Sequence, residues 1–375
     1  MLARKLAAAA IAVTVCTPFA AMAAGPEKVS GPGALPECLK PWNEQIAYFK
    51  WPAKEGPYRI ALANGFVGNT WRIQMVKTAK AFAAQPGIKE DIAEFKVVST
   101  GTDVAAQIAA IDNFINSGYD AIVTIAVNPK AFTPVIRRAN AAGVVLVPFD
   151  NVVDSEDVLM VNEDQLQMGR MMGEWLVKNV PDKSGKILEV RGLPGNSVDR
   201  DRHLGFREIM EADGNKFEII EVVGNWDDGT AQKVVADAVA IHKKFDGMYV
   251  QGGSTGAVRA LIDAKHPFIP VSGEGENGFR KLCAAHAKDG LVCSSATQSP
   301  ALVSIAMKAA ITALKGEAVP QMVSVPIPYA EAGTLKAGEN YYPDLADNFF
   351  VGNSFPACGV EFTGDEIMAR SETDN

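Results

Sequence analysis

The sequence predicts an α/β fold of two lobes, each built on a parallel β-sheet of its own. The first observation is that strand-length apolar runs alternate with helical patterns from residue 58 onward. Repeated strand–helix units of this kind form parallel sheets with right-handed crossovers. The second observation is that the units come in two sets, at about 58–150 and 186–297, and each set is long enough for a complete sheet.

The predicted strands are mostly continuous apolar runs, which are typical of a parallel sheet covered by helices on both faces. They span 58–64, 95–100, 120–126, 144–149, 186–191, 217–223, 246–251, 268–272 and 291–297. The helix expected after the second strand has apolar residues at positions 104, 108, 111 and 115, begins after Thr102 or Asp103 and ends at Gly118. Two stretches, 149–165 and the proline-interrupted 321–333, are expected to cross between the lobes on either side of a helix at 300–315.

The composition is that of a folded protein that does not bind nucleic acid. Of the 375 residues, 48% are hydrophobic and 21% are charged, which is enough apolar content for two packed cores. The net charge of −8 argues against nucleic acid, because phosphates require a basic surface.

The N-terminus has the three parts of a secretory signal peptide, predicted to span residues 1–23. Arg4 and Lys5 precede an apolar core, and Ala21-Met22-Ala23 forms a small-x-small cleavage site. The alternative, an uncleaved membrane anchor, is disfavoured by the short apolar run and by Pro18. We therefore expect the mature chain to be exported.

Four cysteines remain in the mature chain after Cys16 leaves with the signal peptide. In an oxidising compartment they suggest two disulfides, with three possible pairings. The favoured pairs are Cys283 with Cys293, which closes a short local loop, and Cys38 with Cys358, which joins the two terminal extensions. The alternative, a metal site, has only His286 near Cys283 and lacks a second pair of ligands, so no metal is expected.

Clusters of polar and aromatic residues follow the predicted strands, where ligands bind in open parallel sheets. Asn69 and Trp71 follow the first strand, although they can also be explained as a helix cap and a core residue. Trp226 lies in a loop rich in glycine and aspartate, where a large apolar side chain needs a pocket or a ligand to cover it. Two such indoles, one from each lobe, favour an uncharged ring with many hydroxyl groups.

Charged candidates occur at two further strand ends. Asp150 and Asn151 follow the fourth strand, and a carboxylate there would accept strong hydrogen bonds from ligand hydroxyls. Arg200 offers a planar guanidinium with five donors. Its alternative explanation is a solvated run of alternating charge at 199–202 that caps the following helix.

Two motifs point to enzymes instead. GEGENG at 273–278 fits the dinucleotide pattern G-x-G-x-x-G, but its two glutamates would repel a pyrophosphate. GGSTG at 252–256 fits a nucleophile elbow around Ser254. The acids and histidines that follow it in a hydrolase-like order are Asp263, Glu274, His266 and His286. Only four histidines are present in all, which is little for acid–base chemistry, so a secreted α/β serine hydrolase is kept as the alternative function.

From about residue 58 to 330 the chain resembles the ribose-binding-like periplasmic substrate-binding proteins of ABC sugar importers. The residues that carry the resemblance are Asn69-Thr70-Trp71-Arg72, Asp150-Asn151, Arg200 within the G-x-x-G-x-S-x-x-R-x-R pattern at 192–202, Trp226, Glu274 and Gln298. The resemblance implies that they line a sugar site. Arg72 stands where a second aromatic residue is usual, Asn151 where an arginine is usual, and Gly252-Gly253 where an Asn-Asp pair is usual. These departures favour another pentose, a hexose or a sugar alcohol over ribose.

The same resemblance implies a division of the chain and a role. Two Rossmann-like lobes would be joined by a three-segment hinge, after an N-terminal extension at 24–57. The first lobe would comprise 58–160 and 299–325, and the second lobe 161–298 and 326–375 with the tail. The protein would be a periplasmic monomer without cofactor or enzymatic activity that captures a sugar or sugar alcohol and delivers it to an inner-membrane ABC permease. Service to a chemoreceptor or sensor is a further alternative.

Overall fold

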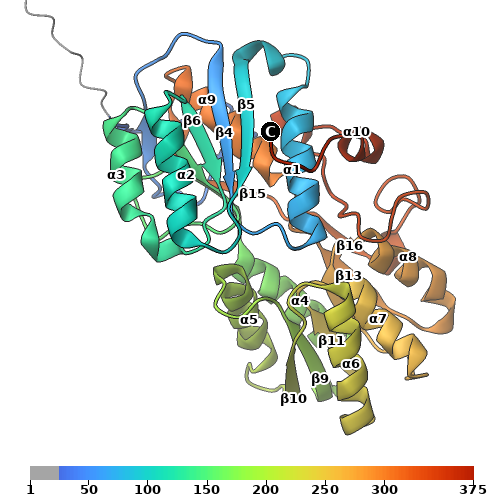
Figure 1. Cartoon of the computed structure of the whole chain (residues 1–375). Helices are drawn as coiled ribbons and strands as arrows, with labels where there is room; N and C mark the ends of the chain where they lie inside the picture. The colour runs from blue at the N-terminus through green and yellow to red at the C-terminus, as the bar shows by residue number, and fades with distance from the viewer. Residues whose placement is uncertain (1–24) are drawn as a thin grey trace, which may run out of the picture.

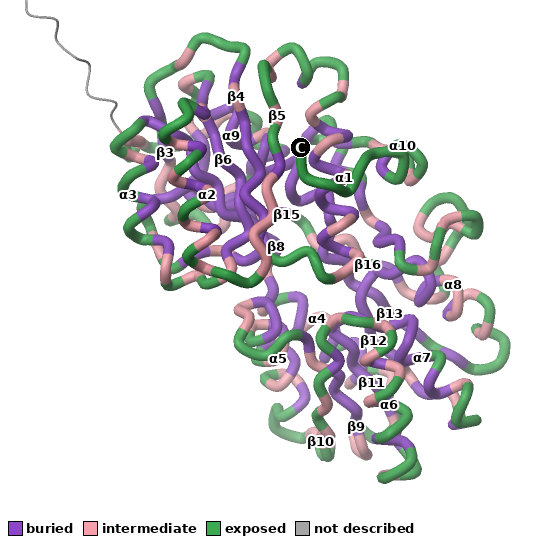
Figure 2. The backbone as a smooth tube through the Cα atoms, in the orientation of Figure 1, coloured by how far each residue is buried: buried purple, intermediate pink, exposed green. Residues whose placement is uncertain are grey.

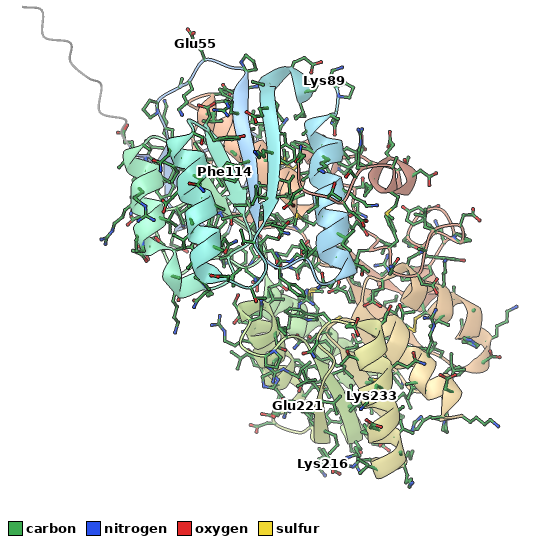
Figure 3. All side chains as sticks on the ribbon, in the orientation of Figure 1. Glu55, Lys89, Phe114, Lys216, Glu221 and Lys233 are labelled. Atoms are coloured by element: carbon green, nitrogen blue, oxygen red, sulfur yellow. A yellow bond between two sulfur atoms is a disulfide. The ribbon has the colours of Figure 1, made fainter. Side chains whose placement is uncertain are left out.

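The computed structural model of the chain describes residues 25–375, so the predicted signal peptide and Cys16 lie outside the described residues. Two α/β lobes follow one another along the long axis of the molecule (Figure 1), which confirms the predicted fold class. The charged side chains of Glu55 and Lys89 lie at the far end of the first lobe, and that of Lys216 lies at the far end of the second (Figure 3). Within the described range, no helix combines the length and hydrophobicity that a membrane crossing requires.

The first lobe is built on a four-stranded parallel sheet. Its strands lie in the order β5 (Ile92–Ser99), β4 (Tyr58–Asn64), β6 (Ala121–Thr124) and β7 (Val145–Pro148). One face packs against α1 (Thr70–Ala83) and α9 (Leu302–Leu314), and the other against α2 (Val104–Asn116) and α3 (Thr133–Ala141). Because both faces are covered, β4, β6 and β7 are almost wholly buried (Figure 2), as their continuous apolar runs predict.

The first lobe continues beyond β7 through three further strands. A parallel bridge between Phe149 and Val161 joins the end of β7 to β8 (Met160–Glu163). β8 pairs in parallel with β15 (Met322–Val325), which pairs antiparallel with β2 (Lys40–Pro41).

The second lobe is built on a six-stranded sheet, parallel except for its last strand. The order is β10 (Lys216–Val223), β9 (Ser184–Arg191), β11 (Gly247–Val250), β12 (Val271–Glu274), β13 (Cys293–Ala296) and the antiparallel β16 (Tyr329–Glu331). One face packs against α4 (Gln165–Asn179) and α5 (Ser197–Met210). The other packs against α6 (Asp228–His242), α7 (Ser254–Asp263) and α8 (Asn277–His286).

Both lobes share one strand order, which determines where a ligand can bind. Counted in chain order within each lobe, the strands lie side by side as second, first, third, fourth and fifth. Between the first and third strands the connections leave in opposite directions, and ligands of such sheets bind beyond the carboxyl ends at that switch point. The switch points are β4/β6 in the first lobe and β9/β11 in the second.

The chain crosses between the two lobes at three places. The crossings follow β8 at Asp164, separate β13 from α9 at 297–301, and separate β15 from β16 at 326–328. The predicted boundary after residue 160 lies one strand too early, because β8 pairs along its length with β15 of the first lobe. The prolines of 326–328 interrupt the third crossing, as predicted.

The N-terminal extension and the last part of the C-terminal tail pack on the first lobe. β1 (Glu27–Val29) and β3 (Tyr48–Lys50) form a small sheet with β14 (Val319–Pro320). Helix α10 (Gly364–Met368) lies beside α1 (Figure 1). The expectation that the whole tail belongs to the second lobe is therefore wrong for its last part, because α1 supplies the surface that α10 covers.

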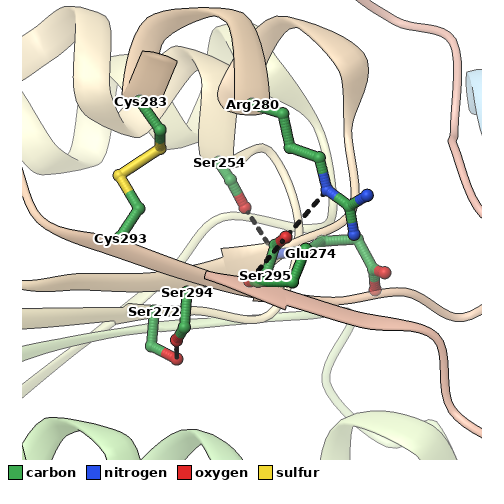
Figure 4. Close-up of a disulfide and its surroundings, with 9 residues drawn as sticks. Ser254, Ser272, Glu274, Arg280, Cys283, Cys293, Ser294 and Ser295 are labelled. Carbon is green, nitrogen blue, oxygen red and sulfur yellow. Dashed lines mark hydrogen bonds between the residues drawn. A yellow bond between two sulfur atoms is a disulfide. The ribbon is translucent and has the colours of Figure 1, made fainter. Parts of the chain in front are cut away.

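Both favoured disulfides are present. Cys38 is bonded to Cys358, so the N-terminal extension and the tail are joined across 320 residues of sequence. Cys283 of α8 is bonded to Cys293 of β13, a separation of 10 residues (Figure 4).

Two residues of the tail cover the open edge of β5. The Val97 N–H donates to Asn375 Oδ1 at 2.9 Å, and the Ser99 N–H donates to Asp374 Oδ2 at 2.8 Å. Asn375 Nδ2 donates in turn to the Phe95 carbonyl at 3.1 Å. The edge strand of the first sheet is thus paired with side chains of the same chain.

Candidate ligand-binding site

A cavity of about 410 Å³ opens between the lobes at the two switch points. Its walls come from the carboxyl ends of β4, β6, β7, β9, β11 and β12 and from the second crossing. Every residue predicted for the site lines it, except Arg200. The lining residues discussed below are Asn69, Trp71, Arg72, Asp150, Asn151, Arg202, Trp226, Gln251, Glu274, Gln298 and Phe350.

The start of α1 places two predicted residues at the cavity. Asn69 Oδ1 accepts a hydrogen bond from the Arg72 N–H at 3.0 Å and caps the helix. Trp71 is buried in the core of the first lobe, and its Nε1 donates to the Gln298 carbonyl at 2.8 Å. The cap and core explanations of these residues are therefore correct, and both residues also line the cavity.

Asp150 belongs to the first-lobe wall of the cavity. Its φ of 62° is left-handed, a conformation that aspartate tolerates better than most residues. The carboxylate pairs with Arg72 Nη2 at 3.4 Å and accepts a hydrogen bond from the side-chain amide of Gln298. Burial raises the pKa of Asp150, while the positive charges of Arg72 and Arg202 act to lower it. Burial lowers the pKa of Arg72, while the negative charge of Asp150 acts to raise it. In the buried wall, the negative charge of Asp150 and the positive charge of Arg72 therefore stabilise each other.

Arg200 lies outside the cavity, and Arg202 lines the cavity where Arg200 was predicted to lie. Arg200 is exposed on α5, where its Nε donates to Asp201 Oδ1 at 2.7 Å. The side chain of Arg202 is only 2% exposed. Residues two positions apart on a helix point about 200° apart, so only one of these arginines can face the cavity.

The guanidinium of Arg202 is held by four neighbours. Its Nη1 donates to Glu274 Oε2 and to the Gln251 carbonyl, both at 2.8 Å. Its Nη2 donates to Gln298 Oε1 at 2.6 Å, and its Nε donates to Gln165 Oε1 at 2.8 Å. Glu274 Oε1 accepts the Gln298 N–H at 2.8 Å. The cluster therefore joins α4, α5, β11 and β12 to the second crossing.

Close packing of α4 and α5 positions Arg202. A Cβ at Gly205 would lie 2.0 Å from the Leu166 carbonyl oxygen, and one at Gly169 would lie 2.2 Å from the Arg202 carbonyl oxygen. Only glycine fits at these two positions. The short distance between the helices brings Gln165 within hydrogen-bonding reach of Arg202.

Trp226 forms part of the second-lobe wall and rests on two glycines. A Cβ at Gly192 would lie 2.1 Å from the indole, and one at Gly252 would lie 2.9 Å from it. Both Asn225 and Trp226 have a φ of 56°, which is a strained conformation for a bulky residue. Such strain collects at functional sites, where the surrounding structure enforces it. The glycine at position 252 is thus required by the tryptophan beside it.

Sequence reasoning missed Arg202, Gln251 and Phe350 as cavity residues. Gln251 directly follows β11 in one of the polar clusters that come after the strands, and its buried Oε1 has no partner among the described residues. Asn151 was predicted, and its Nδ2 donates to the Ala126 carbonyl at 3.2 Å. No sequence signal marked Phe350, which lies far beyond the repeated strand–helix units.

The two enzyme-like motifs bond to each other inside the second lobe. Ser254 Oγ is buried and accepts the Glu274 N–H at 2.9 Å (Figure 4). The Glu276 carboxylate accepts the N–H groups of Gly253, Ser254 and Thr255 at 2.6, 3.0 and 2.8 Å. It occupies the N-terminus of α7, where nucleotide-binding proteins of similar topology hold a phosphate. Burial raises the pKa of Glu276 to about 8. The geometry does not support Ser254 as a nucleophile.

The histidines proposed for the hydrolase alternative bond elsewhere. His266 Nε2 accepts the Phe245 N–H at 3.2 Å, and His286 Nδ1 lies 2.9 Å from Asp289 Oδ2.

One group of metal-type ligands lies on the second lobe among the described residues. It comprises Glu189, His203 and Glu221. Arg207 already donates to Glu189 at 2.8 Å and to Glu221 at 3.2 Å, so a positive charge occupies the position that a cation would need. The group is best described as an ion-pair network.

A comparison with known protein families gives a result that is consistent with a cavity between two lobes of this topology. A family model described as a periplasmic binding protein domain matches residues 60–318, which cover both lobes. The chain belongs to this family. The N-terminal extension and the residues beyond 318 lie outside the part that the periplasmic binding protein domain accounts for.

Several of the proteins to which the chain is similar are named for sugars. The D-ribose/D-allose-binding protein of Pseudomonas aeruginosa is 31% identical over 218 residues, covering 54% of this chain and 66% of that protein. The ribose import binding protein of Bacillus subtilis is 23% identical over 275 residues, covering 72% and 86%. A solved ABC transporter solute binding protein from Thermobispora bispora is 26% identical, with a TM-score of 0.64 over 72% of this chain and 84% of that one. A galactofuranose binding protein, 23% identical with a TM-score of 0.64 over 74% and 95%, shares the fold.

Proposed function

We propose that this protein captures a neutral sugar or sugar alcohol between its lobes in the periplasm and delivers it to an inner-membrane ABC permease. The observation that carries the proposal is that the ionic groups of the cavity are already paired with one another. Arg202 pairs with Glu274, and Arg72 pairs with Asp150. Among the described residues that line the cavity, a charged ligand would find no free counter-charge, whereas hydroxyl groups can add donors and acceptors to each pair.

The polar groups of the wall suit a rim of hydroxyl groups. The carboxylate of Asp150 accepts hydrogen bonds, and the buried Gln251 Oε1 has an acceptor site still unfilled within the described structure. A buried polar atom left without a partner costs about 1–3 kcal/mol, so a ligand that lacks the matching hydroxyl should be rejected. The indoles of Trp71 and Trp226 supply apolar area for the C–H faces of a ring.

The two walls belong to different lobes, which supports binding by closure of the hinge. Asp150 and Trp71 come from the first lobe, and Arg202 and Trp226 from the second. A ligand that contacts both walls binds the closed arrangement better than the open one and therefore shifts the population toward it. The closed lobes present a composite surface that a permease can recognise.

A thermal denaturation screen tests the proposed function directly. The chain from Ala24 onward is heated with D-ribose, D-allose, D-galactose, L-arabinose and xylitol in turn. A ligand at a thousand times its Kd adds about 4 kcal/mol to the free energy of unfolding, so a bound sugar should raise the Tm clearly. A flat result for every sugar and polyol would contradict the proposal.

Trp226→Ala should weaken binding of the best sugar about tenfold while leaving the fold intact. The reason is that Trp226 lies half-buried on two glycines, and loss of an aromatic contact costs about 0.5–1.5 kcal/mol. Titration calorimetry measures the affinity and circular dichroism the fold. Trp42→Ala is the control, because Trp42 is also half-buried but lies outside the cavity. Equal affinities of wild type and Trp226→Ala would remove Trp226 from the site.

A further inference from the structure

The tail adds a residue to the wall of the cavity. Phe350 lies beyond the end of the periplasmic binding protein domain at residue 318, yet it lines the cavity with Trp71. Its side chain is 8% exposed and belongs to the same hydrophobic cluster as Trp71. A segment outside the family domain therefore completes the site.

The second lobe anchors the tail just before and just after Phe350. Asn277, fully buried at the start of α8, donates to three carbonyls of 342–346 at 2.8–3.1 Å and accepts one N–H at 2.7 Å. The Val351 N–H donates to the Gly275 carbonyl at 3.0 Å. Both contacts hold the tail against the loop that carries the β12 end of the cavity.

The first lobe holds Phe350 from the opposite side. Gln74 of α1 is buried, and its side-chain amide bonds both backbone groups of Phe350, at 2.9 Å to the carbonyl and 2.8 Å to the N–H. Asn353 Nδ2 donates to the same carbonyl at 2.7 Å. A few residues later, Cys358 is bonded to Cys38 on the first lobe.

The segment 349–353 lies beside the hinge. Gly352 has a φ of 79°, and a Cβ there would lie 3.0 Å from Pro328 and 3.5 Å from Thr297. These two residues belong to the third and second crossings. Among residues 25–375, the tail therefore forms a fourth passage from the second lobe to the first.

We propose that 349–353 is a fourth segment of the hinge and that Phe350 contacts the ligand and limits which sugars fit the cavity. The inference rests on the proposed function and assigns part of its specificity to the tail. Gln74 of the first lobe and Gly275 of the second lobe both form hydrogen bonds with the backbone of this segment. These bonds fix the position of the Phe350 ring in the cavity wall. Such a wall adds apolar contact for a C–H face and excludes bulkier substituents.

Phe350→Leu tests the inference, with Phe355→Leu as a matched control. Phe355 is a second buried phenylalanine of the tail, 7% exposed, but it does not line the cavity. Titration calorimetry with D-ribose, D-allose, D-galactose, L-arabinose and xylitol gives the affinities of wild type and both variants. We expect Phe350→Leu to change the affinity of the best-bound sugar at least fivefold and to alter the ranking, and Phe355→Leu to stay within twofold of wild type.

Phe350→Tyr is a second variant with which the inference can be tested if Phe350→Leu does not fold. It retains the ring and places a hydroxyl at the cavity wall, so affinities should change while the Tm of the unliganded protein does not. If the folded Phe350 variants bind every sugar with the affinity and ranking of wild type, the inference is wrong and the proposed function still stands. The same holds if Phe355→Leu changes the affinities as much as Phe350→Leu does. A wild type that binds no sugar of the panel would overturn the proposed function and the inference with it.

Discussion

Arg202 is a cation almost without access to water, and its charge depends on neighbours from several elements. Glu274 supplies the counter-charge, and the amide oxygens of Gln165 and Gln298 accept two further N–H groups. Removing one partner of a buried ion pair costs about 3–5 kcal/mol, whereas replacing both by apolar groups of similar volume is often neutral. Comparing the removal of Arg202 alone with the replacement of both Arg202 and Glu274 therefore distinguishes the contribution of Arg202 to stability from its contribution to ligand binding.

Arg202→Met should therefore destabilise the protein by about 3–5 kcal/mol and abolish sugar binding, because Glu274 is left unpaired and the donors are lost. The double variant Arg202→Met/Glu274→Leu should regain most of the stability without regaining binding. Arg200→Ala, the control, should change neither property by more than about 0.5 kcal/mol, since it removes only a surface pair. Thermal denaturation and titration calorimetry measure both. Normal binding by the double variant would exclude Arg202 from the site.

The sequence holds a signal that distinguishes the two arginines. Val198 and Phe206 lie four residues before and after Arg202, and all three are buried. A helix repeats every 3.6 residues, so these residues share one face and Arg200 lies on another. The family pattern at 192–202 marks both arginines, and only the periodicity of the helix shows which one faces inward.

At the scale of elements, β8 brings a buried carboxyl group to the hinge. Glu163 is its last residue and is fully buried. Its Oε1 accepts the Ser299 N–H of the second crossing at 3.3 Å, and its Oε2 has no partner among the described residues. Burial raises the pKa of Glu163 well above its usual range. The hinge thus favours the protonated acid at this position.

Glu163→Gln should make the stability of the protein less sensitive to alkaline pH. Because the folded pKa is raised, Glu163 contributes stability that is complete below about pH 4.5 and is lost as the pH rises through the raised pKa. The difference in Tm between variant and wild type should therefore grow in favour of the variant from pH 5 to pH 8.5. Glu55→Gln, at an exposed site far from the hinge, is the control (Figure 3). A difference that does not vary with pH would contradict the assignment.

On the scale of the whole molecule, the bond between Cys38 and Cys358 fastens both terminal extensions to the first lobe. A cross-link that closes a longer loop removes more conformational freedom from the unfolded chain. Here the loops span 320 and 10 residues, so chain entropy alone favours the longer one by about 3 kcal/mol.

The Cys38→Ala/Cys358→Ala variant should consequently lose more stability than Cys283→Ala/Cys293→Ala. We expect a loss of about 2–5 kcal/mol for the terminal pair, measured by denaturant unfolding of the oxidised proteins. A smaller loss for the terminal pair than for the local pair would show that the extensions stay docked without their covalent link.

The repeated units of the two lobes could be predicted because each strand and helix carries its own periodic pattern. The tail has no such pattern, since its conformation comes from partners far away in the sequence. Asn277 holds 342–346 and Gln74 holds Phe350, and neither pairing leaves a local signal. The helix-like spacing of α9, by contrast, predicted a helix at 300–315, close to its bounds in the structure.

The side chains of Asp374 and Asn375 along β5 bear on how copies of the protein behave at high concentration. An uncovered edge strand offers its N–H and C=O groups to another chain, and self-association can start there. These two residues occupy that position and bond to it at three places. Replacing both residues by alanine would leave the N–H groups of Val97 and Ser99 without these partners, so aggregation of that variant should be attributed to β5 rather than to the ligand cavity.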